Sequence, residues 1–167
     1  SIELTEFNDT WMASPGDEQL SVIDGKQGIN TLEAETSGLI NNSNQIGSKY
    51  INFNQILLSD DVDFWYVSNN DLNLSWINDG EGIGYLNFGP QNNITNSSAI
   101  GFDKLYRGFD VVLLSDGDDE WRASTNDFNL INIRGDNGDD TLSYRDYEIE
   151  IANISKAVID YDYLTFE

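Results

Sequence analysis

The chain contains no cysteine and no histidine, and its 8 Lys and Arg residues face 30 Asp and Glu residues. Without cysteine it forms no disulfide and no thiolate metal site. Without histidine it has no imidazole zinc ligand, no Ser-His-Asp triad and no general base of the usual kind near neutral pH. Because the net charge is −22, the composition excludes a nucleic-acid binder, which would carry the opposite charge.

Long apolar runs are also missing, and prolines number only 2. No run approaches the ~18 residues that a membrane span requires, so we expect no transmembrane segment. The first residues, Ser-Ile-Glu-Leu, are neither a signal peptide nor an initiator methionine. We therefore expect a processed chain or a segment of a longer one.

The residues that are present suffice for a folded protein. At 167 residues, with 39 % hydrophobic and 12 % aromatic residues, the chain is long enough for one domain or one elongated array with a real core. A net charge of −22 destabilises a compact state through self-repulsion unless cations neutralise it. Two interpretations stay open: a solvated acidic surface, as in halophilic proteins, or bound divalent cations.

Three tryptophans mark an internal repeat. Trp11, Trp65 and Trp121 lie 54 and 56 residues apart, and the chain aligns without gaps for more than twenty residues after each of them. The recurring columns are Leu4, Leu58 and Leu114; Asp9, Asp63 and Asp119; Ser14, Ser68 and Ser124; Asp17, Asp71 and Asp127; Ile23, Ile77 and Ile133; Gly28, Gly82 and Gly138; and Leu32, Leu86 and Leu142. This many coincident columns indicates tandem repetition.

The repeat divides the chain into units at about 2–49, 50–105 and 106–158, which we predict to form one elongated domain. The second and third units begin with similar four-residue segments, here called lead-ins. These are Tyr50-Ile51-Asn52-Phe53 and Tyr106-Arg107-Gly108-Phe109. Residues 159–167 resemble a partial next lead-in, which favours a segment of a longer array; a capped C-terminus is the alternative. In the third unit, the alternating residues 147–154 predict a strand.

Apolar residues recur every nine to twelve positions in short β-prone steps that Gly, Asn and Asp turns divide. No helix-period stripe of useful length is present. The sequence therefore predicts an all-β fold, a parallel β-solenoid or β-roll built from three tandem repeats of about 55 residues. A β-sandwich is the alternative.

Acid- and glycine-rich loops supply candidate cation ligands. Glycine lets a loop turn tightly and aim its carbonyls inward, and carboxylates are the hard oxygen ligands that Ca²⁺ prefers. The candidate metal residues are Asp116, Asp118 and Asp119 in one loop; Gly135, Asp136, Asn137, Gly138, Asp139 and Asp140 in another; and Asp60, Asp61 and Asp63 in the second unit. A solvated acidic turn is the alternative for each.

The best of these loops resembles a known motif. Residues 135–143 are similar to the nonapeptide of the repeats-in-toxin (RTX, hemolysin-type) family, in which Gly-Gly-x-Gly-x-Asp precedes x, a large apolar residue and x. Gly138, Asp140 and Leu142 hold the expected places, whereas Asp136 replaces the second glycine. Residues 114–122 are a poorer copy.

The resemblance implies a parallel β-roll with calcium held between its turns by the aspartate side chain and loop carbonyls, and folding outside the cell. The other units depart from the motif. Asn30 and Gly84 stand at the position of Asp140, and Asp79 stands at the position of Gly135. We therefore expect fewer ions than a complete array would bind.

Other recurring residues favour structural roles. We interpret the three tryptophans in register as a core ladder, and Trp76, outside the register, as the candidate for an exposed aromatic. We interpret Asp17, Asp71 and Asp127, each three residues after a serine, as turn-forming acceptors.

Catalysis would have to rely on carboxylates alone, as in glycosidases. The acids recur with the repeat, whereas a catalytic pair is expected once, so the sequence predicts no enzyme. The expected function is a calcium-stabilised structural or adhesive module, secreted or at the cell surface, with end-to-end self-association or a glycan as further partners. A carbohydrate-binding module and an accessory domain of a secreted hydrolase or toxin are the alternatives.

Overall fold

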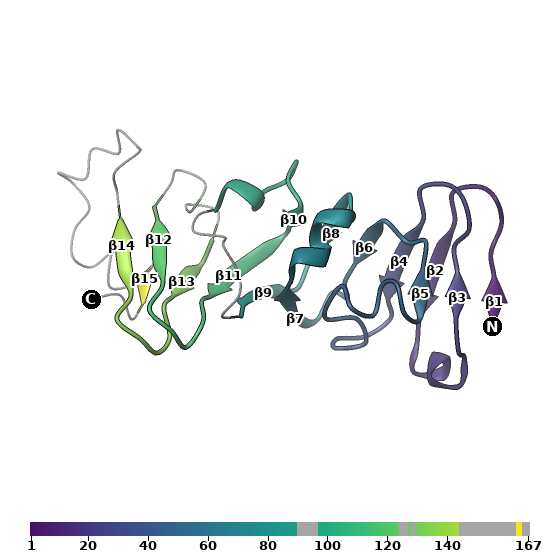
Figure 1. The fold of residues 1–167 in the computed structure, drawn as a ribbon, viewed down its shortest axis with the longest axis horizontal. Helices are drawn as coiled ribbons and strands as arrows, with labels where there is room; N and C mark the ends of the chain where they lie inside the picture. Colours follow the sequence, from purple (N-terminus) through teal and green to yellow (C-terminus); the bar gives the residue numbers. More distant parts are fainter. Residues whose placement is uncertain (90–96, 124–126, 128–129, 144–162, 165–167) are drawn as a thin grey trace.

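The computed structural model describes residues 1–89, 97–123, 127, 130–143 and 163–164 (Figure 1). In chain order the strands are β1 (Ile2–Glu3), β2 (Thr10–Ala13), β3 (Ile23–Asp24), β4 (Thr31–Ala34), β5 (Tyr50–Ile51), β6 (Gln55–Leu57), β7 (Val62–Val67), β8 (Trp76–Asn78), β9 (Ile83–Phe88), β10 (Tyr106–Arg107), β11 (Phe109–Leu113), β12 (Glu120–Arg122), β13 (Asn132–Arg134), β14 (Thr141–Ser143) and β15 (Tyr163–Leu164). Short 3-10 turns include η1 (Pro15–Gln19), η2 (Asn69–Asn73) and η3 (Ser97–Ala99).

Every strand pair among the described residues is parallel. The sheets have the orders β1-β3-β5, β10-β8-β6-β4-β2, β15-β13-β11-β9-β7 and β12-β14. Strands in each sheet skip their sequence neighbours, because the chain crosses to the facing sheet and returns one rung further on. The fold is a parallel β-solenoid, as the repeat predicts, and the β-sandwich alternative is wrong.

The two five-stranded sheets run across the boundaries between repeat units. Strand β4 of the first unit pairs with β6 of the second, and β9 of the second pairs with β11 of the third. The lead-in strand β5 pairs with β3 of the unit before it. The units therefore share their sheets, and the rungs follow one another along the long axis of the molecule (Figure 1).

The core is a row of stacked apolar side chains between facing sheets. Strand β7 shows the local rule, because its side chains alternate between exposed and buried positions over VDFWYV. The largest side chains that are almost wholly buried include Ile23, Leu32, Ile56, Trp65, Ile77, Leu86, Tyr106, Val112, Trp121 and Ile133. Equivalent residues of successive rungs meet in register, for example Ile56, Ile77 and Tyr106.

The predicted tryptophan ladder is wrong, because Trp11, Trp65 and Trp121 lie in three different sheets, where their register partners are Leu32, Leu86 and Leu142. Trp65 and Trp121 are fully buried, and Trp11 is half-buried. Trp76 differs from the prediction, because it is half-buried and the Arg107 guanidinium lies over its ring, 5.3 Å from the centroid.

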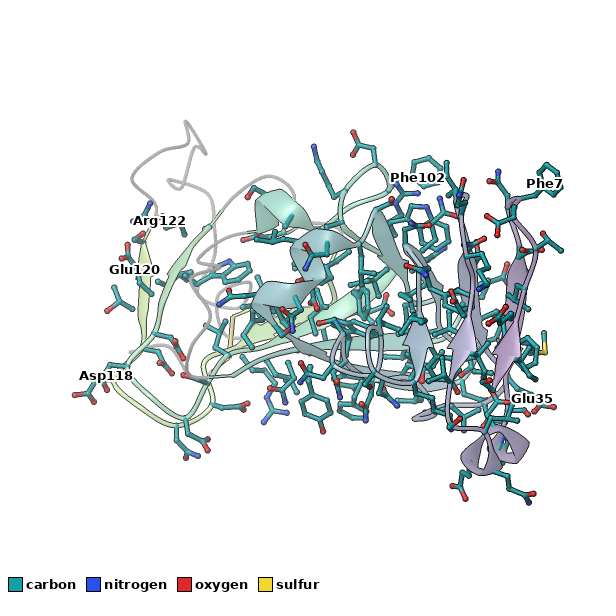
Figure 2. All side chains as sticks on the ribbon, turned by 45° about the vertical axis from the view of Figure 1, so that its right-hand side comes forward. Phe7, Glu35, Phe102, Asp118, Glu120 and Arg122 are labelled. Carbon is teal, nitrogen blue, oxygen red and sulfur yellow. The ribbon has the colours of Figure 1, made fainter. Side chains whose placement is uncertain are left out.

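The exposed aromatics are instead phenylalanines and tyrosines. Phe7 and Phe102 are 77 % and 94 % exposed and point away from the ribbon in Figure 2. On the outer face of β7 and β9, Phe64 stacks on Tyr85 with ring centroids 4.6 Å apart.

Two predicted segments, 147–154 and 159–162, lie outside the described residues. Within the expected lead-in, β15 pairs with β13 through Ile133 and Tyr163. That is the pairing that β5 makes with β3 and β10 makes with β8. Among the described residues, no helix has the length and apolarity to cross a membrane.

Candidate cation-binding loops

The loops that join facing strands stack into three columns. The first column comprises loops 4–9, 25–30 and 52–54; the second comprises 58–63, 79–84 and 108–110; the third comprises 114–119 and 135–140. All of the predicted metal residues lie in the second and third columns. The sequence therefore places its candidate ligands on neighbouring rungs.

A glycine in each column allows the loops to approach closely. A Cβ on Gly28 would lie 2.5 Å from the Phe7 carbonyl oxygen of the loop one rung below. A Cβ on Gly82 or Gly138 would overlap the carbonyl oxygen of Asp61 or Gly117 in the same way. Gly28 and Gly138 also have φ angles of 107° and 130°, which side-chain-bearing residues rarely adopt. This glycine is thus required by stacking of the rungs.

Asp9, Asp63 and Asp119 hold the first loop of each column in shape. One carboxylate oxygen of each accepts both the backbone N–H and the hydroxyl of the residue four positions earlier, at 2.7–2.9 Å. Asp63 also accepts the Gly38 N–H at 3.3 Å through its other oxygen. Loop formation therefore already engages the carboxylates of Asp63 and Asp119, which were predicted as ligands.

The structure brings together the two predicted loops of the third column. The Asn137 side-chain amide donates to Asp116 Oδ1 at 2.8 Å, and the Asp139 N–H donates to Asp118 Oδ1 at 3.0 Å. Asp118 itself points into solvent at this end of the molecule (Figure 2). These outer carboxylates cap the N–H groups of the next rung, so they contribute to stacking as well as to negative charge.

The neighbouring predicted residues lie at the same rim. Asp136 has a φ of 66° and forms an ion pair with Arg134, 3.2 Å apart. In the second column, Asp60 Oδ1 accepts the Glu81 N–H at 3.3 Å. The Asp61 carbonyl packs under Gly82. Asp60 and Asp61 are therefore on the rim and interact with the next rung.

The sixth residue of loops 25–30 and 135–140 points into its column. In the first column this residue is Asn30, which is fully buried. Its Oδ1 accepts the Asp9 N–H at 2.9 Å. Its Nδ2 donates to the carbonyl oxygens of Gly25 at 2.8 Å, Asn52 at 2.9 Å and Gln27 at 3.4 Å. One amide nitrogen therefore lies among three carbonyl oxygens.

In the third column the same position is Asp140, which is 1 % exposed. Its Oδ1 accepts the Asp119 N–H at 3.0 Å, as Asn30 does from Asp9. Its Oδ2 thus takes the place of the Asn30 Nδ2, and this buried oxygen has no hydrogen-bond donor. Burial raises the pKa of Asp140; the Asp119 N–H opposes this effect, and the negative charges of Asp119, Asp118 and Asp136 add to it.

The surroundings of Asp140 fit a calcium ion. The buried Oδ2 of Asp140 stands where the first column has the Asn30 amide donor. A cation there would satisfy this carboxylate oxygen. Among the described residues, no three acidic side chains are already arranged to hold a metal by themselves. A cation in the column would therefore need main-chain carbonyls or water as additional ligands.

In the second column two residues of one loop have exchanged roles, which a comparison of single repeat positions does not reveal. The glycine that lies under Asn30 or Asp140 in the other columns is replaced by Asp79, and the sixth residue is replaced by Gly84. A Cβ on Gly84 would overlap the Asp79 carboxyl group, just as a Cβ on Gly135 would overlap that of Asp140. One polar side chain therefore fills the same space from the opposite strand. In the sequence, this exchange is visible as two departures from the repeat within one loop, at Asp79 and Gly84.

The opposite edge of the solenoid carries a different buried carboxylate. Asp71 Oδ2 accepts the Trp65 Nε1–H at 2.9 Å and the Tyr106 hydroxyl at 2.8 Å. Asp17 does the same with Trp11 and Tyr50, at 2.9 and 3.1 Å. The Trp121 Nε1–H donates to Asp127 at 3.0 Å.

The predicted turn-forming role is confirmed for Ser68 and Asp71, which form a capping box at η2. The tyrosines that bind these carboxylates are perturbed as well. Burial and the adjacent carboxylate charges raise the pKa of Tyr50 and Tyr106 well above the usual value. The buried hydrogen bonds at this edge therefore stabilise the fold.

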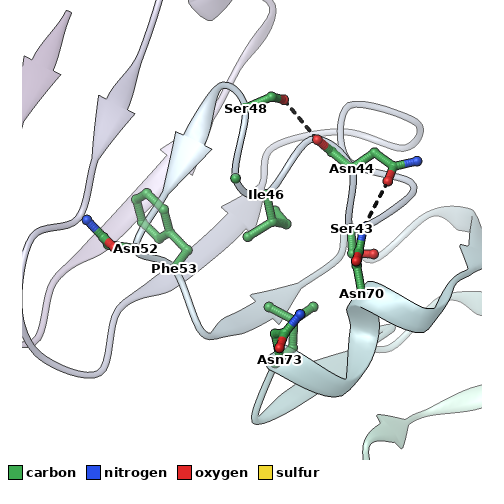
Figure 3. A pocket seen from close by; sticks show the side chains of 10 residues that line it. Ser43, Asn44, Ile46, Ser48, Asn52, Phe53, Asn70 and Asn73 are labelled. Atoms are coloured by element: carbon green, nitrogen blue, oxygen red, sulfur yellow. Dashed lines mark hydrogen bonds between the residues drawn. The ribbon is translucent and has the colours of Figure 1, made fainter.

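A pocket of about 490 Å³ opens between loop 43–48 and η2 (Figure 3). Its lining residues are Ser43, Asn44, Ile46, Gly47, Ser48, Asn52, Phe53, Asn70, Asn73 and Leu74, none of which is charged. Asn44 is held by the Asn70 amide at 3.2 Å and accepts the Ser48 hydroxyl at its carbonyl, at 2.8 Å. In so acidic a chain, a neutral amide-rich pocket suits an uncharged polar ligand.

Comparison with known proteins gives no match to any family model, curated protein or solved structure.

Proposed function

We propose that this chain is a non-catalytic structural module, an RTX-like β-solenoid that Ca²⁺ stabilises outside the cell. The observation that supports this proposal is the buried Oδ2 of Asp140, which lacks a donor at the position where Asn30 Nδ2 binds three carbonyls. A buried carboxylate oxygen without a hydrogen-bond donor or a cation is destabilising. Calcium, with its preference for carboxylate and carbonyl oxygens, supplies the missing positive charge.

In this proposal Asp140 holds the ion together with backbone carbonyls of loop 135–140. Asp118, Asp136 and Asp139 on the rim raise the local negative potential and so favour cation capture. Asp119 keeps its bonds to Ser115 and fixes the neighbouring loop. The bound ion then fixes loop 135–140, which the Asp119–Asp140 and Asp118–Asp139 hydrogen bonds align with the rung before it.

The charge balance suggests where such a module works. With a net charge of −22, mutual repulsion destabilises the compact chain when calcium is scarce. Extracellular calcium modules bind with dissociation constants on the order of 10⁻⁴–10⁻³ M. At ~1 mM calcium such sites fill, and their binding free energy contributes to folding. A secreted or surface-exposed spacer or adhesive segment has these properties.

Thermal melting with calcium and with a chelator tests the proposal. At calcium concentrations about 100 times Kd, one site adds about 2.7 kcal/mol, which raises Tm by roughly 5–10 °C for a chain of this size. Asp140→Asn should reduce this rise and should melt higher than wild type in chelator. Asp103→Asn, an exposed loop variant with the same charge change, is the control. An equal Tm with and without calcium for wild type contradicts the proposal.

A second candidate function is glycan binding at the pocket between loop 43–48 and η2. The neutral amide lining of Asn44, Asn70 and Asn73 supports it, because sugar hydroxyls both donate to and accept from amides. The pocket has one aromatic residue, Phe53, which is 4 % exposed. Glycan-array binding that Asn73→Ala abolishes, with calcium-independent melting, would favour this function over the first.

A further inference from the structure

Three carboxylates from three consecutive rungs surround Gly84 in the second column. Asp63 on β7 is the register partner of Gly84 on β9. Asp110 lies in the register irregularity between Phe109 and Val111 of β11, and its Oδ2 accepts the Gly84 N–H at 3.1 Å. Asp79 packs its carboxyl group against the Gly84 Cα from within the same rung.

Asp79 is the least satisfied of the three. It is fully buried, and neither of its carboxylate oxygens has a hydrogen-bond donor. Burial first, and then the charges of Asp63 and Asp110, raise the pKa of Asp79 to about 7. No ion pair among the described residues involves these three acids. The structure therefore places a buried carboxylate beside two others without a neutralising side chain.

The first column is a neutral version of the same arrangement. The residues equivalent to Asp63 and Asp110 there are Asp9 and Asn54, and Asn54 Oδ1 accepts the Asn30 N–H at 2.7 Å. Asn30 satisfies that column with its own donors. Where the first column has one acid and two amides, the second has three acids and no amide. The substitution of donors by carboxylates indicates a positively charged ligand.

We propose that Asp79 and Asp110 bind a second divalent cation of the Ca²⁺ class, which joins the rungs of β9 and β11. Asp63 contributes negative potential, since its oxygens already accept hydrogen bonds from Ser59 and Gly38. Backbone carbonyls and water complete the shell, a mixture of ligands that Ca²⁺ accepts. This site lies one repeat away from Asp140 and does not rest on the function proposed for that residue.

The test counts the calcium bound per chain by equilibrium dialysis and titration calorimetry, using calcium alone as the probe. Asp79→Asn should lose one ion relative to wild type, and Asp140→Asn should lose a different one, so that the double variant loses both. The Asp79→Asn chain should also melt at a higher temperature than wild type in chelator, because a neutral amide replaces an uncompensated carboxylate. Asp103→Asn, with the same charge change at an exposed site, should bind as many ions as wild type.

Asp110→Asn imitates Asn54 of the first column and keeps an acceptor for the Gly84 N–H. It should weaken the second site at least tenfold, and it provides the measurement if the Asp79 variant does not fold. The inference is overturned if Asp79→Asn, or in its place Asp110→Asn, binds as many ions as wild type with unchanged affinity. Loss of binding only in Asp140→Asn would overturn this second site and leave the first proposal standing.

Discussion

Trp65 and Tyr106, which lie on different rungs, donate to the same carboxylate oxygen of Asp71 at 2.9 and 2.8 Å. Asp71 is fully buried, and both donors are almost wholly buried. A single acid therefore links the core ladder of one unit to the lead-in strand that completes it. The Ser68 backbone N–H also binds this carboxylate, at 3.2 Å, and fixes the start of η2.

Asp71→Ala should be among the most destabilising substitutions in the chain. It leaves the Trp65 N–H and the Tyr106 O–H without an acceptor, and each unsatisfied buried group costs about 1–3 kcal/mol. We expect a loss of at least about 3 kcal/mol in urea unfolding followed by tryptophan fluorescence. Asp17→Ala should cost less, because its partner Trp11 is only half-buried. Equal losses for the two variants would contradict this explanation.

The raised pKa values of Tyr50 and Tyr106 predict that the folded chain loses stability at alkaline pH. In the unfolded chain a tyrosine ionises near pH 10, whereas these two stay protonated in the folded chain. Above pH 10 the unfolded state therefore binds fewer protons than the folded state. The free energy of unfolding then falls by about 1.4 kcal/mol per pH unit for each tyrosine.

Urea unfolding between pH 9 and 11.5 measures this slope, and absorbance at 295 nm reports when the tyrosines ionise. Tyr106→Phe should make the slope smaller while lowering the stability at pH 8. Ionisation of all tyrosines near pH 10 in the folded protein would show that these hydroxyls are not protected.

Gly82→Ala tests the close stacking of the rungs. The added Cβ would overlap the Asp61 carbonyl oxygen, which is backbone and cannot rotate away. Overpacking of this kind costs about 1–3 kcal/mol or more. Gly16→Ala is the matched control, because its nearest neighbour would be the Ser14 hydroxyl at 3.6 Å, an ordinary contact. Similar melting temperatures for the two variants would disprove the stacking requirement.

The sequence predicted the solenoid because short β-prone steps recur in tandem repeats, a pattern typical of stacked rungs. It was wrong about the tryptophan ladder, because the equivalent strands β2, β7 and β12 fall in different sheets. It did not predict that β4 would pair with β6 across a unit boundary, since pairing between units depends on loop paths with no periodic signal. The Tyr106–Asp71 bond was missed because the tyrosine belongs to a lead-in 35 residues away.

The candidate site was predicted in part. The loops containing Asp118 and Asp139 do meet, because the two residues are 21 positions apart, which is one turn of the solenoid at this point. The bonds of Asp63 to Ser59 were not foreseen, although the serine four residues earlier was visible in the sequence. Asp79 was not predicted as a ligand, because its position taken alone indicates only the loss of a glycine. The exchange becomes visible when Asp79 and Gly84 are considered together.

Asn30→Asp would give the first column the chemistry of the third. The new Oδ2 would lie among the carbonyl oxygens of Gly25, Gln27 and Asn52, where the Asn30 amide nitrogen now donates. In chelator the variant should lose about 2–4 kcal/mol, because a buried carboxylate replaces a hydrogen-bond donor. Calcium should restore part of this loss and should add one bound ion per chain. Asn54→Asp, which keeps the oxygen that accepts the Asn30 N–H, should show a smaller loss in chelator. If calcium leaves the Asn30→Asp chain as unstable as chelator does, the carbonyl arrangement of these columns does not suffice to bind the ion, and the calcium interpretation of Asp140 fails with it.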